Sequence, residues 1–261
     1  MNKYLIGSLL VLTTIISCNT PPQKEVFVQT TSPITATDAR YAKIDSAQHY
    51  ELDLVYPLID GELESDVLNK INNTIGDRFY SYAKQNDFIE AHQDLPEHFY
   101  NDDSEYYGLL KNTYRITQCD SVLGVWFSVY QYYLGAAHGF TLQYAVYFNL
   151  NNGDEIQSTD FFRTDEKSLQ QIGSIFNNHL PDTICWGVTD DSTALESIKN
   201  PVFLTDSISF KLNDYSLCAY AYGFTTVTIA KSEFDSLLTG PATQNCNEIF
   251  PVIDESEIAM H

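Results

Sequence analysis

Apolar and polar residues alternate from residue 50 to 56, and this pattern predicts a half-buried strand. Pro57 and Gly61 follow it and are expected to end it. Between residues 62 and 85 the spacing of apolar residues changes to that of an amphipathic helix. The residues on its predicted apolar face are Val67, Leu68, Ile71, Ile75, Phe79 and Tyr82.

The middle of the chain predicts two hairpins. Apolar-rich segments at 110–119 and 122–134 flank Asp120-Ser121, which is a plausible tight turn. A strand at 141–149 then leads to Asn152-Gly153, a dipeptide typical of hairpin turns. Residues 86–107 lie between the predicted helix and the first hairpin. Their apolar residues show no periodic spacing, and we interpret the segment as a loop.

Two histidines, His92 and His98, lie in that predicted loop. Their separation of six does not place them on one helix face as a metal-ligand pair. We therefore expect both to be exposed loop residues.

Helical spacing returns at 165–180, where Thr164 is the expected N-cap. Residues 181–200 show no clear pattern and are expected to be irregular. Four short elements are predicted after them: strands at 202–204, 208–212 and 225–229, and a helix at 232–238. The order of elements predicts an α+β fold of antiparallel sheets with two main helices.

The first residues have the pattern of a secretory signal. Lys3 precedes an apolar run from Leu5 to Ile16, and Ser17 lies before Cys18. The run is too short for a spanning helix, so residues 1–17 are predicted to be a signal peptide. A cysteine at the cleavage point is typical of bacterial lipoproteins, in which Cys18 would be lipidated; an ordinary signal peptide cleaved nearby is the alternative.

Residues 18–40 are rich in Thr, Ser and Pro and predict a flexible tether. Together with the lipidation signal, this predicts a protein of the bacterial cell envelope. It would be attached to the membrane through its lipid, facing the periplasm or at the outer membrane.

The net charge of the chain favours some classes of binding partner and argues against others. Without the signal peptide, 13 basic residues stand against 35 acidic ones, a formal charge of −22. Nucleic acid requires a basic surface, so no nucleic-acid partner is expected. A cationic protein would be attracted and steered. An acidic surface that only keeps the protein soluble is the alternative.

Four cysteines lie beyond Cys18: Cys119, Cys185, Cys218 and Cys246. An exported chain can hold disulfides, and four cysteines permit three pairings. Free buried thiols are the alternative. No two of them have the spacing of zinc ligands.

Candidate chemistry centres on His138, in the small-residue turn 135–139. A histidine there could act as a base, but the sequence marks no serine or cysteine partner for it and contains no Gly-x-Ser-x-Gly nucleophile motif. We expect no enzymatic activity, no cofactor and no metal. We interpret His138 as a turn residue that bonds backbone or contacts a partner.

Two blocks of the sequence resemble a known family. The turn 135–139, its strand, the Asn-Gly turn and Ser158–Phe162 are similar to the family signature of Gly-Gly-Ala-His, strand, Thr-Gly and Asp-x-Phe. Residues 203–234 agree in order with a second block. This family is the extracellular module of lysozyme-responsive anti-sigma factors of the RsiV type, which also occurs beside peptidoglycan deacetylases of the PdaC type.

The resemblance has departures and implies a domain order. Ala136 replaces the second glycine of the signature. No anti-sigma segment or deacetylase domain is recognised, so signalling by cleavage and deacetylation are not expected. The implied parts are a smaller N-terminal α+β subdomain at 41–119, a larger RsiV-like subdomain at 120–240 and a polar tail at 241–261.

The resemblance also implies a function. It indicates a module that binds lysozyme-like cationic hydrolases or cell-wall peptidoglycan, with Tyr133, His138 and Phe140 as candidate partner-binding residues. Two alternatives stay open. One is a peptidoglycan-acting hydrolase that uses His138, and the other is a structural envelope protein without a soluble ligand.

Overall fold

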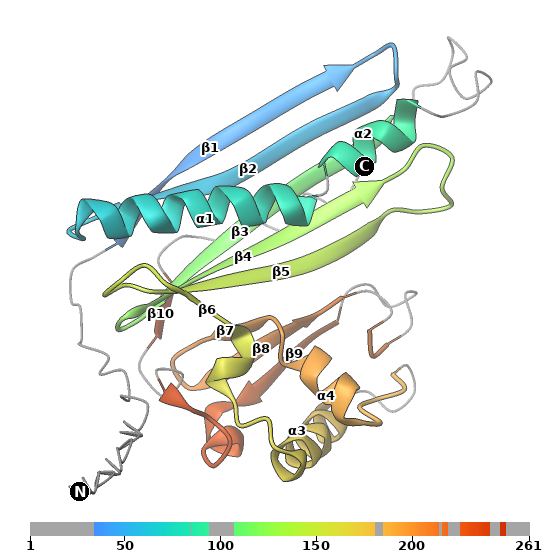
Figure 1. Ribbon diagram of the computed structural model, residues 1–261. Helices are drawn as coiled ribbons and strands as arrows, with labels where there is room; N and C mark the ends of the chain where they lie inside the picture. Colours follow the sequence, from blue (N-terminus) through green and yellow to red (C-terminus); the bar gives the residue numbers. More distant parts are fainter. Residues whose placement is uncertain are drawn as a thin grey trace, which may run out of the picture.

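The computed structural model describes residues 34–83, 85–93, 107–180, 185–213, 216–218, 225–240 and 246–248. A seven-stranded sheet with the order β1-β2-β3-β4-β5-β6 dominates it, and β10 joins this sheet by pairing with β3 (Figure 1). Neighbouring strands pair antiparallel except β2 and β3, which are parallel. The strands are β1 Ile34–Asp45, β2 Tyr50–Gly61, β3 Gly108–Cys119, β4 Val122–Tyr132, β5 Phe140–Asn149, β6 Glu155–Ile156 and β10 Cys246–Glu248.

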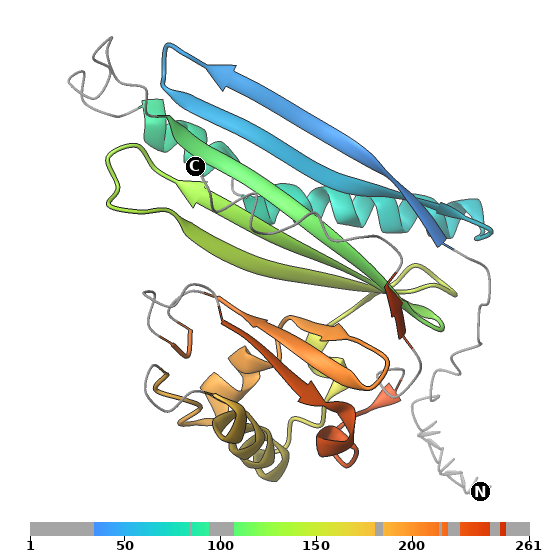
Figure 2. The same cartoon turned by 180° about the vertical axis from the view of Figure 1, so that it is seen from behind.

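A second sheet has three antiparallel strands in the order β7-β8-β9 and lies beside the large sheet (Figures 1 and 2). The architecture is therefore α+β, as predicted. The remaining elements are α1 Ser65–Ala83, α2 Gln85–Gln93, η2 Ser158–Phe161, α3 Glu166–His179, α4 Asp191–Ser197, β7 Pro201–Phe203, β8 Ser207–Leu212, β9 Thr225–Ala230 and η4 Lys231–Phe234.

Strand β4 is buried on both faces, and its alternate residues belong to two separate cores. Leu123, Val125, Phe127 and Val129 pack in the core that contains α1, whereas Val122 and Trp126 pack in the core that contains α3 and the small sheet. A strand covered on both sides has apolar residues at consecutive positions. The large sheet is therefore the middle layer of the molecule.

One buried indole group and one buried hydroxyl group join these layers. The indole Nε1 of Trp126 and the hydroxyl of Tyr147 both donate to the carbonyl oxygen of Pro201, at 3.1 and 2.7 Å. Aromatic side chains with a polar group need such a partner when they are buried. These bonds fix the start of β7 against β4 and β5.

Strand β2 separates from β3 after Asp53, where their pairing ends. Two asparagines then take the place of a neighbouring strand. Asn112 bonds both the N–H and the carbonyl of Val55, each at 2.7 Å. Asn72 does the same for Ile59, at 2.7 and 2.9 Å.

Pro57 was predicted to end this strand, and that prediction is wrong, because β2 continues to Gly61. Backbone N–H groups of alternate residues point the same way in a strand, so position 57 shares the side of Val55 and Ile59. Both of those N–H groups bond to asparagine side chains and not to β1. A proline between them removes no bond to β1.

Several predicted boundaries change. Strand β1 begins at Ile34, so the tether predicted to reach residue 40 is wrong over 34–40. The subdomain boundary predicted between 119 and 120 falls in the turn between β3 and β4, which pair within one sheet. In the predicted polar tail, residues 246–248 form β10. The cap of α3 is Asp165 rather than Thr164.

Two segments predicted to be irregular contain helices. Residues 85–93 of the predicted loop form α2, and residues 191–197 of the segment 181–200 form α4. None of the helices in the described part of the chain has both the length and the apolar character needed to span a membrane. Cys18 and the predicted signal peptide lie outside the described residues.

The four cysteines beyond Cys18 form two disulfides. Cys119 bonds Cys246 across 127 residues, and Cys185 bonds Cys218 across 33. The first connects β10 to the end of β3, where Cys119 and Cys246 are also register partners. The connectivity Cys119–Cys246 with Cys185–Cys218 is one of the three pairings that the sequence left open.

Candidate binding site

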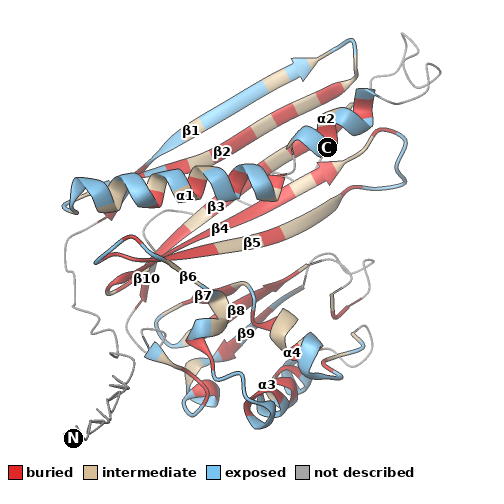
Figure 3. Cartoon of the chain, viewed as in Figure 1, coloured by how far each residue is buried: buried red, intermediate tan, exposed pale blue. Residues whose placement is uncertain are grey.

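Of the three predicted partner-binding residues, Tyr133 and His138 lie in the connection between β4 and β5, and Phe140 is the first residue of β5. Residues 135–138 are exposed, and Figure 3 shows this connection at the end of the β4–β5 hairpin. The turn is tight: Gly135 has a φ of +87°, and the N–H of Ala136 donates to the carbonyl of Tyr133 at 2.9 Å. A positive φ is accessible to glycine without steric strain. A small-residue loop is thus presented at one end of the sheet.

His92 of α2 lies directly under this loop and is fully buried. Its Nδ1–H donates to the carbonyl of Phe88 at 2.8 Å, while its Nε2 accepts the N–H of Leu134 at 3.3 Å. Burial lowers the pKa of His92, although the bond to Phe88 opposes this effect. The neutral ring therefore connects α2 to the loop.

The prediction that His92 is an exposed loop residue is wrong, because α2 buries it. His98 lies outside the described residues. Gly108 is needed for this arrangement, since a Cβ there would lie 1.8 Å from Nε2 of His92. The sequence signal that could have located α2 is the pair Phe88 and His92, which are four residues apart and so share a helix face.

Tyr133 and Phe140 belong to an aromatic cluster that supports the loop. The ring of Tyr133 stacks on Phe140 with centroids 6.2 Å apart, and it contacts Phe88 at 5.2 Å and His92 at 5.8 Å. Burial raises the pKa of the Tyr133 hydroxyl, with a smaller effect from Asp87. The structure thus brings Tyr133 and Phe140 together, and Tyr133 is half-buried rather than a fully presented contact residue.

His138 lies on the exposed part of the loop, where its Nδ1–H donates to the carbonyl of Gly139 at 2.9 Å. Gly139 itself is buried, and a Cβ there would lie 2.3 Å from the hydroxyl oxygen of Tyr130. The backbone at position 139 is therefore packed closely on β4. Residues 135–138 form the accessible surface, and we call them the tip.

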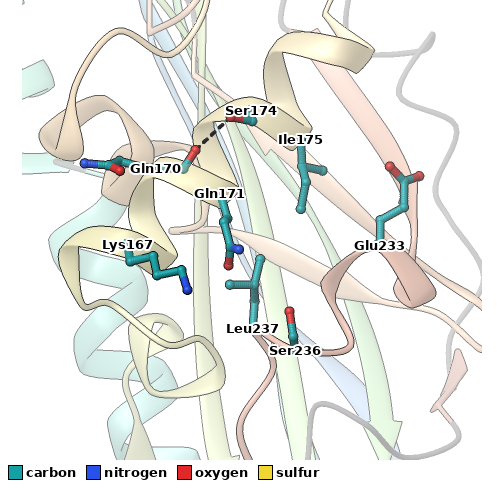
Figure 4. Close-up of a pocket in the computed structure, with 8 residues that line it drawn as sticks. All are labelled: Lys167, Gln170, Gln171, Ser174, Ile175, Glu233, Ser236 and Leu237. Carbon is teal, nitrogen blue, oxygen red and sulfur yellow. Dashed lines mark hydrogen bonds between the residues drawn. The ribbon is translucent and has the colours of Figure 1, made fainter.

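A second concave surface lies between α3 and η4, and the sequence did not reveal it. Its volume is about 510 Å³. Figure 4 shows amide, hydroxyl and charged side chains around two apolar ones, with the hydroxyl of Ser174 donating to the carbonyl of Gln170 at 3.0 Å. The lining residues are Lys167, Gln170, Gln171, Ser174, Ile175, Glu233, Ser236 and Leu237.

The polar part of this groove follows helical spacing. Lys167, Gln171 and Ser174 lie at intervals of four and three residues, which places them along one face of α3. Glu233 of η4 closes the other side and accepts a bond from Nε2 of His179 at 3.0 Å. Within the described part of the chain, no group of three or more His, Cys, Asp or Glu residues is arranged to hold a metal ion.

No family model matches the sequence, and no curated protein matches it. Solved structures are similar in fold. A DUF3298 family protein from Pseudomonas aeruginosa PAO1 has a TM-score of 0.52 at 11% sequence identity, covering 83% of this chain and 99% of that chain. A member of the DUF3298 family from Bacteroides fragilis NCTC 9343 has a TM-score of 0.53 at 15% identity, covering 81% and 95%. The chain is therefore similar in fold to proteins of the DUF3298 family.

Proposed function

We propose that this chain is a non-enzymatic binding module of the bacterial cell envelope, anchored through Cys18, and that the tip is its contact surface. The observation that carries this proposal is the fixed presentation of exposed residues on a buried support. Loops held by a rigid scaffold are frequent sites of recognition. The sequence signal at residues 1–18 and the resemblance to the RsiV-type extracellular module support the envelope assignment.

The first candidate partner is a cationic protein such as a lysozyme. The formal charge of −22 after signal removal would steer such a partner toward the module. The resemblance points to the same class. Specific binding would then depend on the shape of the tip, because attraction between net charges alone is weakened by salt.

The groove between α3 and η4 supports a second candidate, binding of cell-wall glycan. Lys167, Gln171 and Ser174 place ammonium, amide and hydroxyl groups along one face of α3 in the groove. Such groups can exchange hydrogen bonds with sugar hydroxyl and acetamide groups. A purified peptidoglycan fragment that binds the wild-type protein but not Gln171→Ala would support it.

The decisive experiment is binding of the protein to a cationic lysozyme at low and moderate salt. We compare His138→Ala and Ala137→Arg with Ser81→Arg, whose residue is also exposed but lies on α1. The two arginine variants change net charge equally. The proposal predicts at least about tenfold weaker binding, roughly 1.4 kcal/mol, for the two tip variants only.

Binding that disappears at moderate salt, or that all three variants retain, would contradict the tip as contact surface. Unchanged thermal unfolding in each variant shows that a loss is local. Tyr133→Ala is unsuitable for this test, because Tyr133 supports the fold through Phe88 and His92.

A further inference from the structure

Strand β1 forms one edge of the large sheet. It pairs with β2 along its whole length, from Ile34 opposite Gly61 to Asp45 opposite Tyr50. Within the described residues, no other strand pairs with it, and Figures 1 and 2 show it on the outside of the sheet. An edge strand presents a row of backbone N–H and carbonyl groups that can pair with another strand.

The asparagine bonds of β2 show which residues of β1 direct their backbone groups outward. The N–H groups of Val55 and Ile59 point away from β1, so their partners Arg40 and Ala36 form pairs without hydrogen bonds between β1 and β2. The backbone groups of those β1 residues therefore point outward. By alternation, every even-numbered residue of β1 presents its N–H and carbonyl at the edge.

The residues of β1 from Ile34 to Ile44 are complementary to themselves when two copies run antiparallel about Ala39. Asp38 then lies opposite Arg40 of the second copy, and this occurs twice. None of the other opposed pairs brings like charges together. They are Ile34 with Ile44, Ala36 with Ala42, Thr37 with Tyr41 and Thr35 with Lys43.

This register agrees with the backbone phase, because it places even-numbered residues opposite even-numbered residues. A shift of the register to either neighbouring position that keeps this phase is unfavourable. One shift places Arg40 opposite Arg40, and the other places Asp38 opposite Asp38. Like charges directly opposite each other destabilise a strand pair.

Ile34 and Ala36 are buried in their own chain, but most of the other side chains of β1 are exposed. Arg40 has 64% of its side chain exposed, and its bidentate ion pair with Asp53 uses Nε and one terminal nitrogen. Ile44 and Tyr41 are 68% and 41% exposed. The exposed Thr37 of the second copy would lie opposite Tyr41 and cover part of it, and Ile44 would lie beside the end of the second strand at Ile34.

We propose that two copies of this chain associate through antiparallel pairing of their β1 strands about Ala39, which extends the large sheet across a two-fold axis. The occupant of the edge is a second copy, because the charge order of β1 complements itself. A two-fold contact of this kind uses the edge of both copies and therefore closes at a dimer.

The test is disulfide trapping in the full-length protein. In the proposed dimer the two Ala39 residues form a pair without hydrogen bonds, with Cα atoms about 4.5 Å apart, a separation that a disulfide can span. Ala39→Cys should form a covalent dimer on mild oxidation. Ala42→Cys is the matched control, because its two copies would lie about 20 Å apart at about 3.4 Å per residue.

A second variant separates dimerisation from folding. Ala42 directs its N–H outward, so Ala42→Pro removes an edge donor and no bond to β2, much as Pro57 is accommodated in β2. Adding Ala42→Pro to Ala39→Cys should abolish the covalent dimer while the circular dichroism spectrum is retained. The proposal is overturned if Ala39→Cys cross-links no more than the more exposed Ala42→Cys, or if Ala42→Pro leaves cross-linking unchanged in a folded protein.

Discussion

At the residue scale, the surroundings of His92 in the candidate site determine the protonation state of its ring. Both ring nitrogens have backbone partners, Phe88 and Leu134, and this arrangement requires the neutral ring. A protonated ring cannot accept the N–H of Leu134, because both nitrogens then carry hydrogens. Protonation of His92 in acid should therefore loosen the support of the tip.

This gives a prediction for stability against pH. Because the pKa of His92 in the folded protein lies below 6.5, the unfolded chain binds more protons as the pH falls through that value. The free energy of unfolding should then decrease with falling pH until the folded pKa is reached. The slope from this residue is at most about 1.4 kcal/mol per pH unit.

Urea unfolding at pH 7.5 and pH 5.5 measures this effect. His92→Phe should be less stable at pH 7.5, since it leaves the N–H of Leu134 without its partner, but its stability should fall less on acidification. His138→Ala is the control and should keep the wild-type difference. An identical difference in His92→Phe would show that other groups cause the acid sensitivity.

At the scale of elements, the bonds of Asn112 and Asn72 explain how β2 leaves the sheet. Each asparagine satisfies one N–H and one carbonyl of β2, which buried backbone groups require. The bonds of Asn112 are buried and those of Asn72 are partly buried. Their removal should therefore have unequal effects.

We predict that Asn112→Ala lowers the free energy of unfolding by about 2–4 kcal/mol, because it leaves two buried backbone groups unpaired. Asn72→Ala should lower it by about half as much, since water can replace part of its bonding. Chemical denaturation of the two variants measures both values. Equal losses, or a smaller loss for Asn112→Ala, would contradict this account of β2.

Elements with strong periodicity were predicted correctly. Helix α1 and strands β3, β4 and β5 lie where apolar spacing placed them, because each buries a full face or both faces. Strand β1 was missed because most of its residues are exposed, so its apolar pattern is weak. The three residues of β10 are too few for any pattern, and a disulfide holds them in place.

The sequence likewise predicted some features of the candidate site and missed others. The sequence placed His138 in the turn 135–139 with Tyr133 and Phe140 on either side of that turn, and the structure brings Tyr133 and Phe140 into ring contact. The support from His92 depends on a contact between α2 and Leu134, 42 residues apart, which local patterns do not contain. The groove between α3 and η4 likewise joins segments that are distant in the sequence.

At the scale of the whole molecule, the two disulfides close loops of different length. Cys119–Cys246 encloses 127 residues and Cys185–Cys218 encloses 33. Loss of unfolded-state entropy alone gives about 5 kcal/mol of stabilisation for the longer loop and about 4 kcal/mol for the shorter one.

We therefore predict that the double variant Cys119→Ser with Cys246→Ser loses more stability than Cys185→Ser with Cys218→Ser. Thermal unfolding of both double variants under oxidising conditions measures the order. The first variant also frees β10 from β3, which adds to its loss. A larger loss in the second variant would show that the shorter loop holds the fold together.

The Cys185–Cys218 disulfide lies within the segment that Cys119–Cys246 closes, and this affects the order in which the two bonds can form. Chains are made from the N-terminus at about 5–20 residues per second, so Cys119 is made roughly 6–25 seconds before its partner Cys246. Cys185 and Cys218 are both made within that interval. If each cysteine bonded the next one made, Cys119 would bond Cys185. The native connectivity therefore requires that Cys119 stay reduced, or exchange its partner, until β10 with Cys246 has been made.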